Sequence, residues 1–176
     1  MSGGWHSAFM VSVEEAKPED IVFIREIAND VFCQYGDYSN IITKFFSAQG
    51  VSTFIARVPT EVGGFAMMGF LPWSGGEGKG NSWIADLLAI AVKPELQRQG
   101  IGTALMQGVM QLIQEMSEWR DIHEIQLTCA ESNRVGLDFF VSKGFHVVDP
   151  VHGKYSSGQR AVRLSKRWMS PKPGLE

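Results

Sequence analysis

The stretch Ala91-Val92-Lys93-Pro94-Glu95-Leu96-Gln97-Arg98-Gln99-Gly100-Ile101-Gly102-Thr103-Ala104-Leu105 decides the fold of this chain. An apolar run ends at Pro94 and a helical apolar pattern begins after Gly100, which predicts a strand, a short turn and a long helix. The first N–H groups of a helix lack partners, and the helix dipole adds about half a positive charge there. Gly100 and Gly102 leave that backbone bare. The stretch predicts an anion-binding helix start or, as the alternative, only a tight turn.

The strand before this turn, residues 83–92, is apolar on both faces, which is typical of a central strand in a covered sheet. Strict alternation places Ile84, Asp86, Leu88, Ile90 and Val92 on one face and Ala85, Leu87, Ala89 and Ala91 on the other. The helix is expected over residues 99–118, and the next strand over residues 124–129. Because a helix connects them, the two strands should be parallel with a right-handed crossover.

Other periodic stretches surround this unit. We expect strands at 11–13, 53–58, 64–71, 145–148 and 160–164, and helices starting at Pro18, over 41–48, and from a Ser132 or Asn133 cap to Lys143. A loop is expected at 149–159. The glycine-rich segment 72–81 predicts a flexible hairpin loop; the alternative, a phosphate cradle in a nucleotide-binding protein, lacks the GxxxxGK[ST] spacing.

Length and charge restrict the class of protein. The 176 residues predict a single domain, 1–176, with loose tails at 1–9 and 169–176. A net charge of −3 without a basic block argues against nucleic acid, and no stretch is apolar enough to span a membrane. Two cysteines indicate reduced thiols in a cytoplasmic protein, and a homodimer is compatible with the sequence. The four histidines lack metal-ligand spacing, so no metal is expected.

Two motifs resemble those of the GCN5-related N-acetyltransferase (GNAT) superfamily. Its [QR]xxGx[GA] signature appears as residues 97–102, Gln-Arg-Gln-Gly-Ile-Gly, after Val92-Lys93-Pro94. Its second motif, NxxAxxxYxxxGF, appears from Asn133 to Phe145. The element order from about residue 11 to 165 also matches this family, so the resemblance covers nearly the whole chain.

The resemblance implies an α/β acyl-CoA-binding fold. Its mixed, mostly antiparallel sheet would have about six to seven strands, with helices on both faces and a parallel pair, 83–92 and 124–129, that splays apart to hold acetyl-CoA. Pantetheine would pair with the freed edge of the first strand, and an N–H near Ile90 would polarise the thioester carbonyl. The residues implied in cofactor binding are Ile90, Ala91, Val92, Gln97, Arg98, Gln99, Gly100, Ile101, Gly102, Thr103, Asn133 and Phe140.

Asp86 is the candidate catalytic base. It is the only charge in its apolar strand, and burial would raise its pKa toward a useful range. The resemblance also places a base at this strand position. The alternative is a structural carboxylate bonded to a neighbouring loop or to Trp83.

The sequence departs from the family pattern where a Tyr would protonate the leaving thiolate, because Phe140 stands there. Three explanations stay open. The thiolate leaves unaided, which its pKa near ~8.5 allows; another group such as Tyr155 or Cys129 serves; or the protein is slow or inactive. Gly136 also replaces the usual Ala.

The predicted activity is transfer of acetyl from acetyl-CoA to a primary amine of a small molecule or a peptide N-terminus, by direct attack. The alternative is an acyl-CoA-binding sensor without turnover. The acceptor pocket should lie between the first two helices and the loop 149–159, whose aromatic and histidine side chains line it or belong to the core: Phe32, Tyr35, Tyr38, Phe45, Phe46, His152 and Tyr155. A basic cluster, Lys154, Arg160, Arg163, Lys166 and Arg167, could favour an acidic acceptor or the 3′-phosphate of the cofactor, or form a solvated face.

Overall fold

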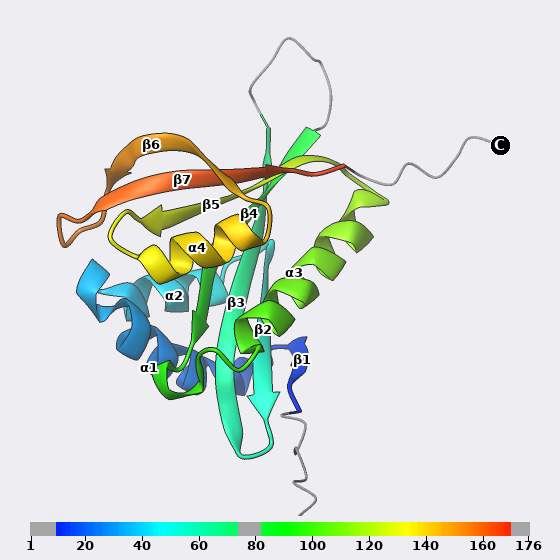
Figure 1. The fold of residues 1–176 in the computed structure, drawn as a ribbon. Coiled ribbons are helices and arrows are strands. Elements are labelled where there is room, and N and C mark those ends of the chain that lie inside the picture. Colours follow the sequence, from blue (N-terminus) through cyan, green and yellow to red (C-terminus); the bar gives the residue numbers. More distant parts are fainter. Residues whose placement is uncertain (1–9, 74–81, 170–176) are drawn as a thin grey trace, which may run out of the picture.

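The strand predicted over residues 83–92 is β4, Ser82–Val92, and it lies in the middle of a seven-stranded sheet. The computed structural model describes residues 10–73 and 82–169. The sheet order is β1-β2-β3-β4-β5-β7-β6, as Figure 1 shows. The other strands are β1 Ser12–Glu15, β2 Val51–Val58, β3 Glu61–Pro72, β5 Asp121–Ala130, β6 His146–Lys154 and β7 Arg160–Arg167.

The predicted tails 1–9 and 169–176 and the predicted hairpin loop 72–81 lie, except at their edges, outside the described residues. Pro72 ends β3 and Ser82 begins β4. These two strands are antiparallel neighbours, as a hairpin requires. Within the described ranges, no helix is long and apolar enough to cross a membrane.

The predicted parallel pair is confirmed, and it separates toward its carboxyl end. β4 pairs with β5 from Ser82–Asp121 as far as Leu87–Leu127. Beyond Leu87, β4 keeps its partner β3 up to Val92, while β5 pairs only with β7 on its other side. The arrowheads of β4 and β5 therefore point in diverging directions in Figure 1. This divergence leaves the facing edges of both strands without a strand partner.

Helices cover both faces of the sheet, and each face has its own core (Figure 1). α3, Ile101–Ser117, and α4, Arg134–Ser142, pack on one face. α1, Ile21–Phe32, and α2, Tyr38–Phe46, pack on the other over β2, β3 and β4. Pro18 begins a 3₁₀ turn, Pro18–Asp20, before α1, as its position at a helix start predicts. The mixed sheet with helices on both faces confirms the predicted fold class.

The strict alternation predicted for β4 is wrong, because the strand contains a β-bulge. Met67 pairs with Ala89 and the next residue, Met68, pairs with Leu87, so Leu88 has no partner on β3. One extra residue in a strand reverses the sheet face to which every later side chain of that strand points. Ala85 and Leu87 accordingly pack in the α3 core, whereas Ala89 and Ala91 pack in the α1–α2 core. Asp86 lies before the bulge and shares its face with Leu88, not with Ile90 and Val92.

The predicted loop 149–159 is also wrong over its first half. β6 continues to Lys154 through two register shifts, with Asp149 opposite Arg163 and Gly153 opposite Ala161. Pro150 is accommodated because β6 is an edge strand, where a missing N–H costs no ladder hydrogen bond. The loop between β6 and β7 is therefore only 155–159. The ends of the helices differ from prediction by a few residues, since Gly100 stands before α3 and α2 begins at Tyr38.

Candidate active site

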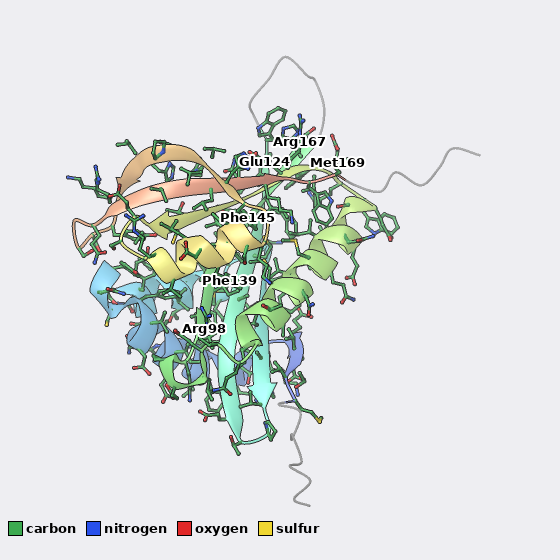
Figure 2. All side chains as sticks on the ribbon, viewed as in Figure 1. Arg98, Glu124, Phe139, Phe145, Arg167 and Met169 are labelled. Carbon is green, nitrogen blue, oxygen red and sulfur yellow. The ribbon has the colours of Figure 1, made fainter. Side chains whose placement is uncertain are left out.

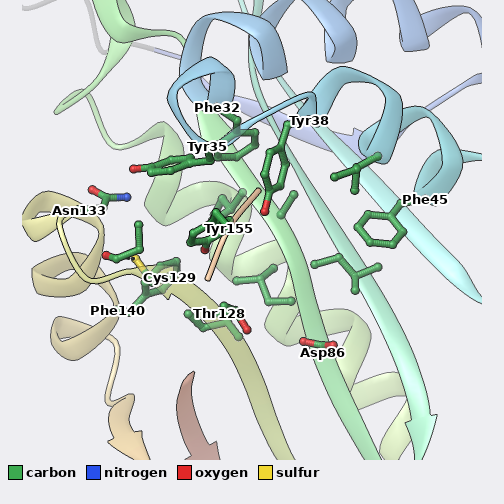
Figure 3. A pocket seen from close by; sticks show the side chains of 17 residues that line it. Phe32, Tyr35, Tyr38, Phe45, Asp86, Thr128, Cys129, Asn133, Phe140 and Tyr155 are labelled. Carbon is green, nitrogen blue, oxygen red and sulfur yellow. Dashed lines mark hydrogen bonds between the residues drawn. The ribbon is translucent and has the colours of Figure 1, made fainter. Parts of the chain in front are cut away.

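A cavity of about 260 Å³ lies in the gap where β4 and β5 diverge. Its walls come from both sides of the sheet. β4 and β5 supply the floor, α1, α2 and the residues between them supply one side, and α4 supplies the other (Figure 3). The aromatic side chains that line it are Phe32, Tyr35, Tyr38, Phe45, Phe140 and Tyr155. Asp86 is the one acidic residue among its lining residues within the described part of the chain.

The β6–β7 loop is fastened to the segment between α1 and α2, and this contact places Tyr155 in the wall of the cavity. The Ser156 hydroxyl donates to the Tyr35 carbonyl at 3.2 Å, and the Gln159 side-chain amide donates to the Gln34 carbonyl at 3.1 Å. Gly36 makes this approach feasible, because a Cβ there would lie 1.9 Å from the Ser156 Oγ. As a result the rings of Tyr35 and Tyr155 lie 5.1 Å apart, centroid to centroid.

Three tyrosine rings form one aromatic group at this wall. The Tyr38 ring lies 5.9 Å from the ring of Tyr155 and 6.4 Å from that of Tyr35. Burial raises the pKa of all three phenols, so each is neutral near pH 7. The wall is therefore aromatic and uncharged. Phe46 instead packs in the α1–α2 core, and His152 is not a lining residue.

Asp86 is half-buried and faces this cavity from β4 (Figure 3). Burial raises the pKa of its carboxyl, and the positive charge of Arg163 opposes that shift. Within the described residues, neither Trp83 nor a loop group donates a hydrogen bond to it, so the structural alternative finds no support. A carboxyl in this setting can accept a proton from an ammonium group placed in the cavity.

The helix start that the sequence indicated lies at the other end of the gap. Gly100 precedes α3 with φ +87°, and a Cβ on it would meet no atom within 4 Å. Ala104 has the first N–H in α3 that donates to a backbone carbonyl, and its acceptor is the Gly100 carbonyl at 2.9 Å. The earlier amides, including those of Ile101, Gly102 and Thr103, are the free donors of a helix start. An anion at this turn would meet backbone N–H groups and the positive end of α3.

Other residues of the turn hold its shape. Arg98 has φ +64°, a left-handed conformation that costs an L-residue energy. The Gln97 side chain donates to the Val92 carbonyl at 3.2 Å, and the Gln99 side chain donates to the Glu95 carbonyl at 3.3 Å. Figure 2 shows Arg98 at the turn that precedes α3. A Cβ on Gly102 would lie 3.6 Å from the Phe139 ring, so the two helices approach closely there.

Lys143 is a cation at this turn that the sequence analysis missed. Its Nζ donates to the Thr103 Oγ1 at 3.1 Å, which brings a positive charge from the end of α4 to the first turn of α3. The only signal in the sequence was its position before Gly144, at the predicted end of a helix. A Lys near a helix C-terminus interacts favourably with the helix dipole. Its reach to α3 depends on the packing of the two helices.

The residues expected on the far side of the gap lie there. Asn133 and Phe140 line the cavity, and the edge of Ile90, Ala91 and Val92 that faces β5 has no strand partner. Asn133 also caps α4, because its Oδ1 accepts from the Gly136 N–H at 2.9 Å.

Gly136 lies close to the capping side chain. A Cβ at this position would lie 2.5 Å from the Asn133 Nδ2, so an Ala there requires a shift of the Asn133 side chain.

Two groups were considered as replacements for the missing Tyr acid. Burial raises the pKa of the Cys129 thiol to about 11, and its Sγ donates to the Ala130 carbonyl at 3.6 Å. Burial raises the pKa of Tyr155 as well, with the tyrosine and cysteine neighbours acting in the same direction. Both groups lie in the cavity wall in their neutral forms. Within the described ranges, no group of three or more His, Cys, Asp or Glu side chains is placed to hold a metal ion.

Comparison with known proteins gives the following matches. The model of the acetyltransferase (GNAT) family matches residues 19–145. N-alpha-acetyltransferase 20 of Dictyostelium discoideum is 30% identical over 91 residues, which are 51% of this chain and 50% of that protein. The chain therefore matches about half the length of this curated relative.

Solved structures of acetyltransferases share the fold. The ribosomal-protein-S18-alanine N-acetyltransferase from Escherichia coli superposes with a TM-score of 0.71 at 17% identity, over 95% of this chain and 100% of that one. Arabidopsis thaliana NAA60 in complex with acetyl-CoA gives a TM-score of 0.72 at 14% identity, over 90% and 98%. At these identities the likeness establishes the common fold.

Proposed function

This chain belongs to the acetyltransferase (GNAT) family, and we propose that it transfers an acetyl group from acetyl-CoA to a primary amine by direct attack. One observation carries the proposal: the gap between β4 and β5 joins a bare helix start at one end to a half-buried carboxyl at the other. A cofactor with an anionic and an acyl end fits the first part. An acceptor amine that must lose a proton fits the second.

Acetyl-CoA would lie along the open edge of β4. The amides from Arg98 to Thr103 and the Lys143 ammonium would hold the pyrophosphate, which agrees with the room above Gly100. The unpaired edge of Ile90, Ala91 and Val92 would accept the pantetheine amides as an added strand. The bulge at Leu88 supports this placement, since it lies directly after Leu87, where the pairing of β4 with β5 ends.

The acceptor would enter from the α1–α2 side, where the tyrosine wall faces Asp86. Asp86 takes the proton from the ammonium, directly or through water, and the free amine attacks the thioester carbonyl. The new N–C bond forms as the C–S bond breaks, and the electron pair leaves on the thiolate. The proton that the attacking nitrogen still has to lose then passes to the departed thiolate or to water. Coenzyme A thiolate can leave without an acid, because its pKa is near ~8.5 by analogy with free Cys.

We propose a peptide N-terminus as the first acceptor to test. The similarity to N-alpha-acetyltransferase 20 supports it, and the largely aromatic cavity of about 260 Å³ has room for an apolar first side chain beside the amine. A small-molecule amine is the other acceptor class.

Cys33 and Cys129 are both free thiols, which supports a reducing compartment such as the cytoplasm.

The second candidate function, an acyl-CoA sensor, is favoured by one observation, Phe140 in place of an acid. The test measures free thiol released from acetyl-CoA with a panel of peptides and small amines, beside the thermal midpoint with and without acetyl-CoA. We expect both stabilisation and amine-dependent thiol release. Stabilisation without release for any amine would identify the sensor, and the absence of both would contradict acyl-CoA binding altogether.

A further inference from the structure

Arg163 lies on the same face of the sheet as Asp86, two strands away. Strand pairing places Asp86 beside Gln126, and Gln126 beside Ser165. Arg163 pairs with Thr128 on β5. This pair lies two residues along the strands from the row of Asp86, Gln126 and Ser165, in the direction of the cavity. Thr128 itself lines the cavity. α1 and α2 pack over β2, β3 and β4, and Thr128 is exposed, so this polar part of the face is accessible from solvent.

The Arg163 guanidinium is oriented by two other side chains. Its Nη2 lies 2.9 Å from the His152 Nε2, and the His152 Nδ1 lies 3.3 Å from the Asp149 Oδ2. In this chain of contacts a neutral His152 accepts from Arg163 and donates to Asp149, which fixes its tautomer. Within residues 10–73 and 82–169, no carboxylate lies within 4.0 Å of Arg163. The remaining N–H donors of the guanidinium are therefore available to a ligand.

We propose that Arg163, oriented by His152 and Asp149, binds a carboxylate of the acceptor while the acceptor amine lies at Asp86. This inference rests on the proposed acetyl transfer and specifies its substrate class. Two strand spacings separate the two residues by about 10 Å across the sheet, and two residues separate them by about 7 Å along it, which gives about 12 Å between their backbones. An extended peptide advances about 3.4 Å per residue, and the long Arg163 side chain shortens the span that the ligand has to cover. A carboxylate on the second or third residue of a peptide, or at the far end of an amino acid with a long carbon chain, spans that distance.

The chemistry favours a carboxylate as the ligand group. The planar guanidinium offers paired N–H donors that match the two carboxylate oxygens. The phosphates of acetyl-CoA belong at the α3 helix start, on the other side of the gap. Arg163 therefore adds a selective contact for the acceptor, separate from the one that holds the cofactor.

The test compares acceptors that differ only in one charge. The first pair is a peptide with an apolar first residue and Glu at the second position, and the same peptide with Gln there. The second pair is 6-aminohexanoate and its amide, which separates a side-chain carboxylate from that of a small molecule. For at least one pair we expect the acid to have about tenfold or more the kcat/KM of the amide, as a charge-assisted hydrogen bond gives. Equal values in both pairs would overturn the proposal.

Variants locate the effect. Arg163→Gln should reduce the acid-to-amide ratio to near one, and Arg163→Lys should retain part of it. Arg163 also lowers the pKa of Asp86, so its loss changes the rate with both acceptors of a pair equally. The acid-to-amide ratio is the readout because this shared change cancels in it. A ratio unchanged in Arg163→Gln would contradict the assignment.

Arg167→Gln is the matched control. Arg167 pairs with Glu124. This pair lies two residues along the strands from Ser165, in the direction away from the cavity, and Figure 2 shows both residues at that end of β7. It should leave the ratio as in the wild type. For the positioning role, His152→Ala should lower the ratio, and His152→Gln, whose amide oxygen can accept from Arg163, should restore part of it.

Failure of this inference is distinguishable from failure of acetyl transfer. Thiol release with amides and acids alike, at equal kcat/KM, removes the carboxylate site and leaves the acetyltransferase. Absence of thiol release with every amine, in a protein that acetyl-CoA still stabilises, overturns the proposed activity and this inference with it.

Discussion

On the α3 side of the gap between β4 and β5, the site is made of backbone from one continuous stretch, residues 97–103. On the α1–α2 side it is made of side chains from elements far apart in the chain, among them Tyr35, Asp86 and Tyr155. The first side is the proposed site of the pyrophosphate, which every acyl-CoA shares, and such a site needs only free N–H groups and little side-chain bulk. The second side can vary with the acceptor. The comparison predicts that changes on the α3 side affect cofactor binding, whereas changes on the α1–α2 side affect turnover and acceptor choice.

The largest expected effect is at Asp86. Asp86→Asn should lower turnover on the order of 10²-fold or more, because the ammonium loses its base. Acetyl-CoA should still raise the thermal midpoint as in the wild type, since the helix start is untouched. Steady-state thiol release and thermal shift measure the two effects. Unimpaired turnover would remove Asp86 from the mechanism.

Gly100→Glu tests the other side. The left-handed φ of +87° strains any side chain there, and a carboxylate would repel the pyrophosphate. We expect acetyl-CoA affinity to fall by about tenfold or more, since one repulsive charge and one strained residue each oppose binding. Calorimetric titration measures it, with Gly50→Glu, which has a similar φ and no atom within 4 Å of a Cβ, as the control for strain alone. Equal affinity in the two variants would break the assignment of this turn to the pyrophosphate.

The pH profile sharpens the role of Asp86. A base must be ionised, so kcat/KM should rise with pH through the Asp86 pKa, which burial raises above the ordinary Asp value of 3.8. Arg163 lowers that pKa, so Arg163→Gln should move the acid limb to higher pH by removing a favourable positive charge. An acid limb that the Arg163 substitution leaves in place would show that another group limits the rate.

Phe140→Tyr should have a small effect. If the thiolate leaves unaided, a new phenol near it should change turnover by no more than about threefold, because the leaving group is already as weakly basic as a free thiolate. A gain of tenfold or more, seen in single-turnover thiol release, would show that the wild-type enzyme lacks an acid it needs.

The smallest effect is expected at Arg98. Arg98→Gly relieves a left-handed conformation, φ +64°, and should stabilise the protein by about 0.5–1 kcal/mol after the entropy cost of glycine. Acetyl-CoA affinity should change little, since only backbone amides of this residue are assigned to the pyrophosphate. Urea unfolding measures the stability, and a loss of stability would mean that the Arg98 side chain holds the turn.

The same comparison explains what could be predicted from the sequence. The helix start was predictable because a local pattern, Gly100 and Gly102 after an apolar strand, encodes it. Asp86 was predictable as a lone charge in an apolar run. The faces of β4 were not, because the bulge at Leu88 arises from the pairing of two strands and leaves no mark in the alternation of β4 itself. The carboxylate site was beyond prediction for the same reason, since it depends on the register that places Arg163 two strands from Asp86.

The course of β6 was also set by tertiary structure. Proline and glycine at 150 and 153 are typical of a loop, but an edge strand tolerates both. Lys143 reaches Thr103 only through the packing of α4 on α3. Local chemistry therefore predicted the cofactor side, and the long-range contacts of the acceptor side required the structure.

A crystal structure with coenzyme A bound tests the central claim most directly. We expect the pyrophosphate against the amides from Arg98 to Thr103, the pantetheine along Ile90 to Val92, and the thiol in the gap between β4 and β5, beside the cavity that contains Asp86. A pyrophosphate bound elsewhere, or a thiol outside that gap, would contradict the division of the site into these two sides.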